Sequence, residues 1–315
     1  MSTVEEVART VVATVDVSGG YLLAAKWVAD RYQELCSRSR FRHLRRIGEL
    51  SLPADVAAGT VTATRGLRIV AGNATAAAAW TNALIGWHFR ARTTWYEIEG
   101  VSGTSLTLRS EYAEDTLTAG SYRIVQRYTY LDPAVRWLGD FLHMRRRQPI
   151  TRTSLAELDM LHPSRQRVSV GPLLYAEVGE GINPSGARAK QVELYPYCDN
   201  DELIHYVYWS EPPILRLDET LPASIDSYTL KEGALIDAMR MKMTEADKAG
   251  NVERTAFWRN EYRAQKTSWE QYILNAIRTD RGSDDVSFIM QSAGYAAASS
   301  DIVTARDQVI ANWPR

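Results

Sequence analysis

The spacing of apolar positions predicts helices near both ends of the chain. From Tyr21 onward, apolar side chains recur every three or four positions, which places them on one face of a helix running to about Ser37. Two further apolar stripes flank Gly250, a residue suited to the left-handed position that ends a helix. We therefore expect a helical hairpin with apolar positions Leu235, Ala238, Met239, Met243 and Ala246 in its first arm and Trp258, Tyr262, Trp269, Tyr272, Ile273 and Ala276 in its second.

The pattern changes between Gly59 and Val125. Short runs of β-branched and aromatic residues alternate there with turn residues at intervals of about 8–12 positions, which is typical of small antiparallel strands. Apolar Ile98 stands between polar Glu97 and Glu99, and a glycine turn leads into residues 105–108. We expect a hairpin with one polar and one apolar face.

Shorter elements are expected between this stretch and the helical hairpin. Ser154 and Glu157 have the spacing of a capping box and predict a helix over residues 155–161. A second β-hairpin is expected from residues 191–195 and 203–209. A short helical segment is expected around the apolar positions Trp137, Leu138, Phe141 and Leu142.

These patterns predict an α+β fold. In it the N- and C-terminal helices form a helical bundle that carries an inserted small antiparallel β-domain, a second β-hairpin and an extended C-terminal arm. The expected parts are an N-terminal arm and helix over 1–55, the inserted β-domain over 56–126, a body ending in the helix hairpin over 127–279, and a docking arm over 280–315. Residues 1–19 fit a short helix or an adaptable arm equally well.

Composition and charge exclude several classes of protein. The net charge of −1 argues against a surface built throughout for nucleic acid or anionic membrane. With only Cys36 and Cys198, the chain has no disulfide framework, and we expect two free thiols and synthesis in a reducing cytoplasm. No apolar run approaches the roughly 18 residues that a membrane span requires, so we expect no membrane segment.

The sequence contains no recognisable catalytic or metal motif. It has no phosphate-binding loop and no nucleophile elbow, and its histidines (His43, His88, His143, His162 and His205) have no second ligand at a metal-binding offset. The acidic turn at Asp199, Asp201 and Glu202 lacks the glycine and distal glutamate of a calcium loop. We expect no enzyme activity, no cofactor and no metal.

Two groups of basic residues are candidates for contact with DNA. They are Arg38, Arg40, Arg42, Arg45 and Arg46 after the first long helix, and Arg145, Arg146 and Arg147. Arginines next to aromatic residues could follow a DNA backbone. The alternative is a solvated helix end whose cations complement the helix dipole and pair with acids of a neighbouring subunit.

The stretch after about Thr279 is rich in alanine and serine but keeps several apolar positions near helical spacing. These are Ile302, Val303, Val309, Ile310 and Trp313. The stretch is too apolar for a solvated disordered tail. We expect it to become ordered on a partner protein.

The order of short motifs resembles that of the head-to-tail adaptor (connector or neck) proteins of tailed bacteriophages. The motifs are G-T-V-T-x-T from Gly59, I-G-W-x-F from Ile85, W-Y-E-I from Trp95, V-x-G-T-S-L-T-L from Val101, S-Y-R-I from Ser121, G-P-x-x-Y from Gly171, V-E-L-Y-P from Val192 and Y-V-Y-W from Tyr206. The resemblance covers about residues 20–280. Its motifs are structural patterns and include no active-site residues.

This resemblance implies a structural protein of the virion neck, between head and tail. The expected assembly is a homo-oligomeric, twelve-fold ring that binds the portal protein, a tail or nozzle protein and, without sequence preference, the double-stranded DNA in its channel. The stretch after Thr279 would then dock on the portal. The alternative is a carbohydrate-binding or hydrolytic module of the tail tip or tail fibre, in which tryptophans and paired acids form a sugar groove. Because the acids are dispersed, the adaptor interpretation is preferred.

Overall fold

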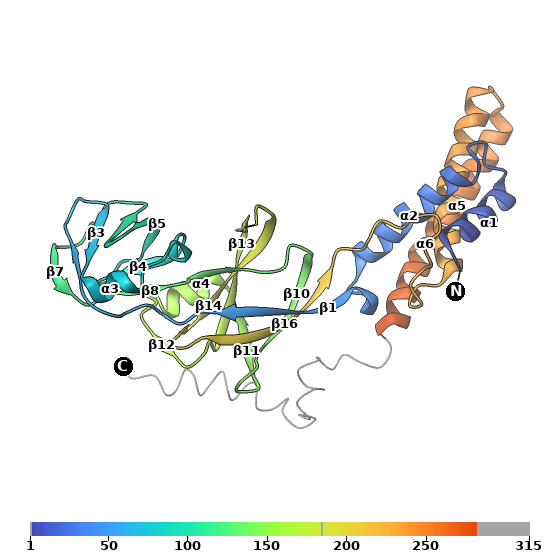
Figure 1. The fold of residues 1–315 in the computed structure, drawn as a ribbon. Helices are drawn as coiled ribbons and strands as arrows, with labels where there is room; N and C mark the ends of the chain where they lie inside the picture. The colour runs from blue at the N-terminus through green and yellow to red at the C-terminus, as the bar shows by residue number, and fades with distance from the viewer. Residues whose placement is uncertain (1, 184, 282–315) are drawn as a thin grey trace. The chain divides into compact units, whose positions relative to one another are not determined.

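The computed structural model describes residues 2–183 and 185–281, which form two compact units (Figure 1). The helical unit comprises residues 2–46 and 209–281, and the β unit comprises the residues between them. Two strands that are neighbours in one sheet, β1 (Arg45–Leu52) and β16 (Glu202–Ser210), carry the chain from one unit to the other. In sequence, the β unit is therefore an insertion into the helical unit.

The helical unit contains α1 (Val4–Val15), α2 (Gly20–Arg38), a 3-10 turn η1 (Arg42–Leu44), α5 (Ser227–Lys248) and α6 (Val252–Arg281). At the start of α1, Thr3 and Glu6 form a capping box: the Thr3 hydroxyl accepts from the Glu6 N–H, and Glu6 accepts from the Thr3 N–H. The N-terminal residues thus form a helix rather than an adaptable arm. The expected helix after Tyr21 is confirmed as α2.

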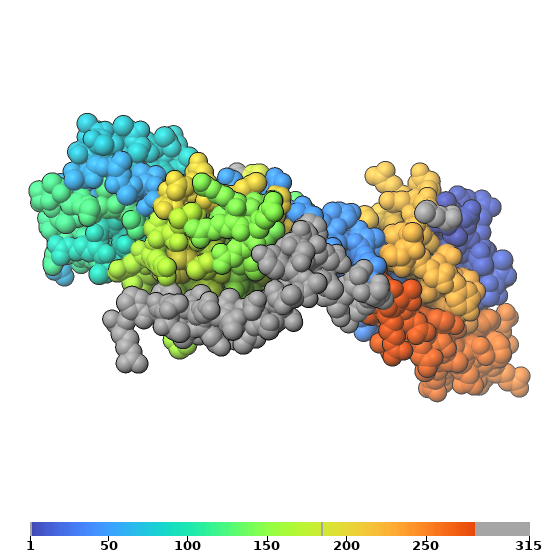
Figure 2. Space-filling view, turned by 90° about the horizontal axis from the view of Figure 1, so that it is seen from below, coloured from blue at the N-terminus to red at the C-terminus, as the bar shows by residue number. Residues whose placement is uncertain are grey.

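The core of the helical unit lies between its helices. Figure 2 shows the outer surfaces of α1 (dark blue), α5 (amber) and α6 (orange) in this unit. Trp269 of α6 is 1% exposed and packs on Gly233 of α5, where a Cβ atom would come within 2.8 Å of the indole ring. Gly250 joins the two helices with φ of 69°, in the left-handed region. The predicted helical hairpin is confirmed.

The first sheet of the β unit has the strand order β1-β16-β10-β11-β13-β14-β9. Its remaining strands are β9 (Tyr128–Tyr130), β10 (Val135–His143), β11 (Gln148–Thr153), β13 (Leu174–Ile182) and β14 (Arg188–Tyr195). The sheet is mixed, because β11 and β13 are parallel while β10–β11, β13–β14 and β14–β9 are antiparallel. Between β11 and β13 lie α4 (Leu155–Leu161) and β12 (Val168–Ser169), which pairs with β15 (Tyr197–Cys198).

The second sheet has the order β7-β2-β3-β6-β5-β4-β8. Its strands are β2 (Val61–Ala63), β3 (Ile69–Gly72), β4 (His88–Arg90), β5 (Tyr96–Ser102), β6 (Ser105–Leu108), β7 (Leu117–Gly120) and β8 (Arg123–Val125), with α3 (Ala74–Ala78) and the 3-10 turn η2 (Asn82–Leu84) between β3 and β4. The predicted hairpin is confirmed as β5–β6, with Ile98 and Leu106 buried and Gly103 at φ of 56° in its turn.

The expected fold class is wrong. The chain is built mainly from two curled seven-stranded sheets, one mixed and one antiparallel, with six α-helices in its described part (Figure 1). It is not a helical bundle with a small β-domain. The first sheet takes six of its seven strands from residues 128–210, where a largely helical body with one β-hairpin was expected.

Two expected elements of this region are corrected. The segment with Trp137 and Phe141 is not helical but forms β10, and residues 191–195 and 203–209 do not form a hairpin. The first of these ranges lies in β14, next to β13 and β9, and the second lies in β16, next to β1 and β10. The short helix at residues 155–161 is confirmed as α4, with the Ser154 hydroxyl as its N-cap.

Candidate functional site

The arginines at the end of α2 are largely engaged within the helical unit. The Arg38 guanidinium lies 3.3 Å from a carboxylate oxygen of Glu34 and 3.6 Å from one of Glu270. The Arg40 guanidinium stacks over the Trp209 ring, 5.2 Å from its centroid. These partners belong to the same chain, whereas the pairing alternative placed the acids on a neighbouring subunit.

The next three basic residues are Arg42, which begins the short turn η1, and Arg45 and Arg46, which begin β1. Arg46 donates to the carbonyl oxygens of His43 and Arg45, at 2.8 and 2.9 Å, and the Arg42 N–H donates to Asp280 of α6 at 3.0 Å. The Arg42 contact joins η1, the turn after α2, to the last turn of α6.

The second basic group lies in the β unit, in the turn between β10 and β11. Arg145, Arg146 and Arg147 are all exposed there, and Arg147 has φ of 52°. The two basic groups therefore belong to different units. The candidate docking residues Ile302, Val303, Val309, Ile310 and Trp313, with nearly all of the arm expected over 280–315, lie outside the described residues.

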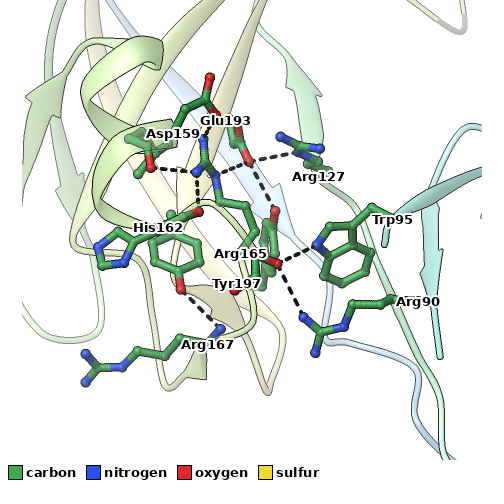
Figure 3. Close-up of polar contacts among 12 residues, drawn as sticks. Arg90, Trp95, Arg127, Asp159, His162, Arg165, Arg167, Glu193 and Tyr197 are labelled. Atoms are coloured by element: carbon green, nitrogen blue, oxygen red, sulfur yellow. Dashed lines mark hydrogen bonds and ion pairs between the residues drawn. The ribbon is translucent and has the colours of Figure 1, made fainter. Parts of the chain in front are cut away.

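A buried ionic cluster that the sequence analysis missed lies in the β unit, between α4 and β14 (Figure 3). Arg165 is 1% exposed and Glu193 is completely buried. Glu193 Oε1 lies 3.0 Å from Arg165 Nε and 2.9 Å from Arg127 Nε, and it accepts a hydrogen bond from the Tyr197 hydroxyl at 3.1 Å. One carboxylate oxygen therefore pairs with two guanidinium groups and accepts a hydrogen bond from a hydroxyl.

Arg165 also fixes the end of α4. Its guanidinium donates to the Leu158 carbonyl at 2.6 Å, to the His162 carbonyl, and to Asp159 at 2.5 Å. Asp159 and Glu193 together balance Arg165 and Arg127, so the cluster is neutral overall. Burying a charge is costly unless it is paired and hydrogen-bonded. Here each buried charge is paired, although Glu193 Oε2 has no hydrogen-bond partner among the described residues.

Proton affinities in the cluster follow from burial and from Glu193. Burial, reinforced by the Glu193 carboxylate, raises the pKa of Tyr197 well above its usual value, so this hydroxyl stays protonated and donates. Burial alone would lower the pKa of Arg127, but the attraction of Glu193 outweighs it and the pKa is raised. Both effects preserve the charges and donors that Glu193 requires.

The loop after α4 is also tied to the second sheet (Figure 3). The Ser164 carbonyl accepts from the Trp95 indole N–H at 3.0 Å and from Arg90 at 3.4 Å. The Arg90 guanidinium stacks on the Trp95 ring, 4.7 Å from its centroid. One loop thereby connects the two sheets, and we interpret the cluster as a structural junction without an open position for a substrate.

A small cavity lies near this junction. Its lining includes Leu52, Asp55, Val125 and Cys198, and its volume of about 20 Å³ suffices for a water molecule but not for a substrate. Burial raises the pKa of the Cys198 thiol to about 12, so this thiol is a poor nucleophile at neutral pH.

One serine–histidine pair in the helical unit is close enough to be considered for catalysis. The Ser224 hydroxyl lies 2.8 Å from His43 Nδ1, and the Tyr32 hydroxyl lies 3.1 Å from Nε2. Burial, together with the nearby Arg46, lowers the pKa of His43 to about 4, so the imidazole is neutral at pH 7. A hydrolytic triad requires a carboxylate on the second ring nitrogen, and a tyrosine occupies that place here. The pair therefore fits a packed core histidine.

Within residues 2–183 and 185–281, no group of three histidine, cysteine or carboxylate side chains could hold a metal ion. In the same part of the chain no single helix has the length and apolar character of a membrane span, although α1 and α2 together, with a 114° bend between them, pass that test.

Comparison with known proteins adds no family assignment. No protein-family model matches the chain, and no curated protein matches it. The sequence holds one indication of this cluster, because Glu193 is a single acid among apolar neighbours in V-E-L-Y, at the end of β14. Such an acid, if buried, requires a cationic partner, but only the fold shows that Arg165 and Arg127 supply it.

Proposed function

We propose that this protein is a structural protein of a tailed bacteriophage, a head-to-tail adaptor subunit that forms a ring between portal and tail. The observation that carries the proposal is the set of large apolar side chains exposed on α6. Val252 is 79% exposed, Phe257 is 54% exposed and Leu274 is 53% exposed. Other residues of the same helix, Trp269 and Ile273, are buried in the core of the unit.

An exposed apolar side chain is ordinary by itself, but several on one long helix favour a contact with another protein. In a ring built from identical subunits, each copy offers one surface to the next copy and receives a different one. The outer side of α6, with Phe257 and Leu274, is the surface that we assign to such a contact.

The remaining parts of the proposal follow from the motif resemblance. The ring has twelve subunits, sits in the virion neck, binds the portal on one side and a tail or nozzle protein on the other, and contacts channel DNA without sequence preference. Residues 280–315 dock on the portal. The protein has no enzymatic activity in this proposal and is made in the host cytoplasm.

The test is the mass of the purified protein, alone and after mixing with its portal. We expect wild-type protein to form a ring by native mass spectrometry and negative-stain microscopy, alone or on the portal. The variant with Phe257→Glu and Leu274→Glu should keep its circular dichroism and lose the ring, because two buried charges would be left without partners. Thr244→Glu, at an exposed position of α5, is the matched control.

Wild-type protein that remains monomeric alone and with the portal would overturn the proposal. A trimeric spike would support the tail-tip alternative instead. That alternative has less support, because each tryptophan that the structure describes is at least partly buried, whereas a sugar groove requires exposed aromatic rings.

A further inference from the structure

The turn between β10 and β11 carries three consecutive exposed arginines. The antiparallel pairing ends at His143↔Gln148, so residues 144–147 form the turn, and its last residue, Arg147, is in the left-handed region. The N–H at the start of the turn, from Met144, donates to the Leu203 carbonyl of β16 at 3.2 Å. The turn is thus attached to a strand on its other side.

Two side chains beneath the turn fix its shape. The Arg146 N–H donates to His143 Nδ1 at 3.2 Å, and the Arg145 guanidinium lies 3.4 Å from Glu202 Oε1. The other oxygen of Glu202 lies 3.5 Å from His143 Nε2. His143 and Glu202 therefore contact each other. His143 also accepts from the backbone of the turn, and Glu202 also pairs with its first arginine, Arg145.

The side chains of His143 and Glu202 are both buried, and burial of polar groups costs desolvation free energy. The side chain of His143 is 1% exposed and that of Glu202 is 2% exposed, and His143 Nε2 has no well-formed hydrogen bond in the described part of the chain. Gly171 packs on the imidazole so closely that a Cβ atom would lie 2.2 Å from Nε2. An apolar pair would fill this space without the desolvation cost, so the polar pair is explained better by the turn that it holds.

The exposed cations of the turn differ from other arginines of the β unit. On the second sheet, Arg68 pairs with Glu99 and Arg109 pairs with Glu97. Within the described residues no ion pair involves Arg146 or Arg147. A guanidinium fits phosphate oxygens in a bidentate manner, and a preformed turn loses little conformational freedom on binding.

We infer that the β10–β11 turn is a preformed binding tip for the phosphates of a nucleic-acid backbone, with His143 and Glu202 as its positioning residues. Arg146 and Arg147 contact the phosphates, and Arg145 anchors the turn through Glu202. The inference rests on the proposed function only in naming duplex DNA as the source of the phosphates.

The test measures binding of the full-length protein to a fluorescein-labelled DNA duplex by anisotropy over a series of salt concentrations. Replacing both phosphate-binding arginines, Arg146→Gln with Arg147→Gln, should reduce the slope of log K against log salt by about 1.8, at roughly 0.9 per phosphate contact. Arg188→Gln, at an arginine that is 83% exposed in β14, is the matched control and should leave the slope unchanged.

Glu202→Gln separates positioning from net charge. This change removes a negative charge beside the tip, so charge alone predicts tighter binding to DNA. The positioning role predicts weaker binding, by about threefold or more, because the turn loses its anchor and must be ordered on binding. Circular dichroism confirms that the variant is folded, and the exposed arginine pair provides the test if it is not.

The inference is overturned if Glu202→Gln binds DNA as tightly as wild type or more tightly, or if the arginine pair behaves like Arg188→Gln. It is also overturned if polyglutamate competes as well as DNA at equal charge, because the tip would then fit an acidic protein. Ring formation is measured on the same variants. If the protein forms a ring whose DNA binding is unaffected by the tip substitutions, only this inference is overturned. If a monomeric protein binds DNA in a manner that depends on the tip, only the proposed ring is overturned.

Discussion

At the scale of single residues, the distinctive feature of this protein is how its buried charges are satisfied. Glu193 has no exposed surface, yet its Oε1 atom is shared by Arg165, Arg127 and Tyr197. The desolvation of such a group is offset only while every partner is present. The cluster is therefore sensitive to the loss of any one partner.

Removing one cation from the cluster should be strongly destabilising. We expect Arg165→Gln to lower the free energy of unfolding by about 3–5 kcal/mol, because it leaves buried Glu193 with less compensation. Arg152→Gln, which breaks the pair with Glu177 at a site where the arginine is 58% exposed, should cost about 0–1 kcal/mol. Urea unfolding measures both, and equal losses would show that the buried cluster has no special role.

His88 should make the β unit sensitive to acid. Burial, and secondarily the charge of Arg127, lower the pKa of His88 from 6.5 to about 4. Protons therefore bind the unfolded chain more readily, so the stabilisation is complete above pH 6.5 and is lost as the pH falls toward 4. At about 1.4 kcal/mol per pKa unit, the full loss is roughly 3 kcal/mol.

The measurement is urea unfolding at pH 7 and at pH 4.5. His88→Phe keeps the aromatic contact with Tyr128 and removes the titrating group, so its stability should fall less than that of wild type. His43 acts in the same direction in the helical unit, and the informative quantity is the difference between variant and wild type. If wild type and His88→Phe lose the same free energy of unfolding between pH 7 and pH 4.5, the assignment to His88 is contradicted.

At the scale of elements, β10 shows how a strand can imitate a helix. Its buried apolar positions Val135, Leu138, Phe141 and Leu142 are spaced by three, three and one residues, as on a helix face. The first three belong to the core of the first sheet, where Phe141 packs against the rings of Tyr175 and Tyr206. A strand covered on both faces lacks the simple alternation that identifies a half-exposed strand.

The pairing of β1 with β16 should depend on a glycine. A Cβ atom on Gly48 would lie 2.3 Å from the ring of Tyr206, a buried residue that packs on Phe141. We expect Gly48→Ala to lower the free energy of unfolding by about 1–3 kcal/mol, as overpacking of a core usually does.

Gly100 of β5 provides the control for this change. The nearest atom to a Cβ there is 3.8 Å away, which is ordinary contact, so Gly100→Ala should be neutral or slightly stabilising. Thermal unfolding compares the two variants. If Gly48→Ala melts at the wild-type temperature, Tyr206 does not pack on β1 in this way.

At the scale of the whole molecule, each unit has its own hydrophobic core. The core of the helical unit draws on residues between Val4 and Leu44 and between Leu215 and Ile273. The three clusters of the β unit draw only on residues between Leu50 and Tyr208. In the described part of the chain, each core is made only of side chains from its own unit, as expected of a unit that folds independently.

A fragment of residues 45–210 should therefore fold alone. It keeps β1 and β16 complete, and so preserves both seven-stranded sheets and the ionic cluster. We expect β-type circular dichroism and a cooperative melt, with Arg165→Gln lowering the melting temperature as in the full chain. A fragment without a cooperative transition would mean that the helical unit is required to stabilise the sheets.

Local patterns in the sequence were sufficient to predict α2, α4, the α5–α6 hairpin and the β5–β6 hairpin. Each is specified by contacts between residues close in the chain: a capping serine before α4, Gly250 between two helices, a glycine turn at Gly103. The pairing of β16 with β1 and β10, and the meeting of Glu193 with Arg165 and Arg127, join residues far apart in the chain. Periodicity carries no information about such contacts, because it shows which residues of one segment share a face and not which distant segment packs beside them. A buried acid likewise does not indicate where its partner lies. The fold class, the ionic junction and the support beneath the arginine turn were therefore decided only by the tertiary structure.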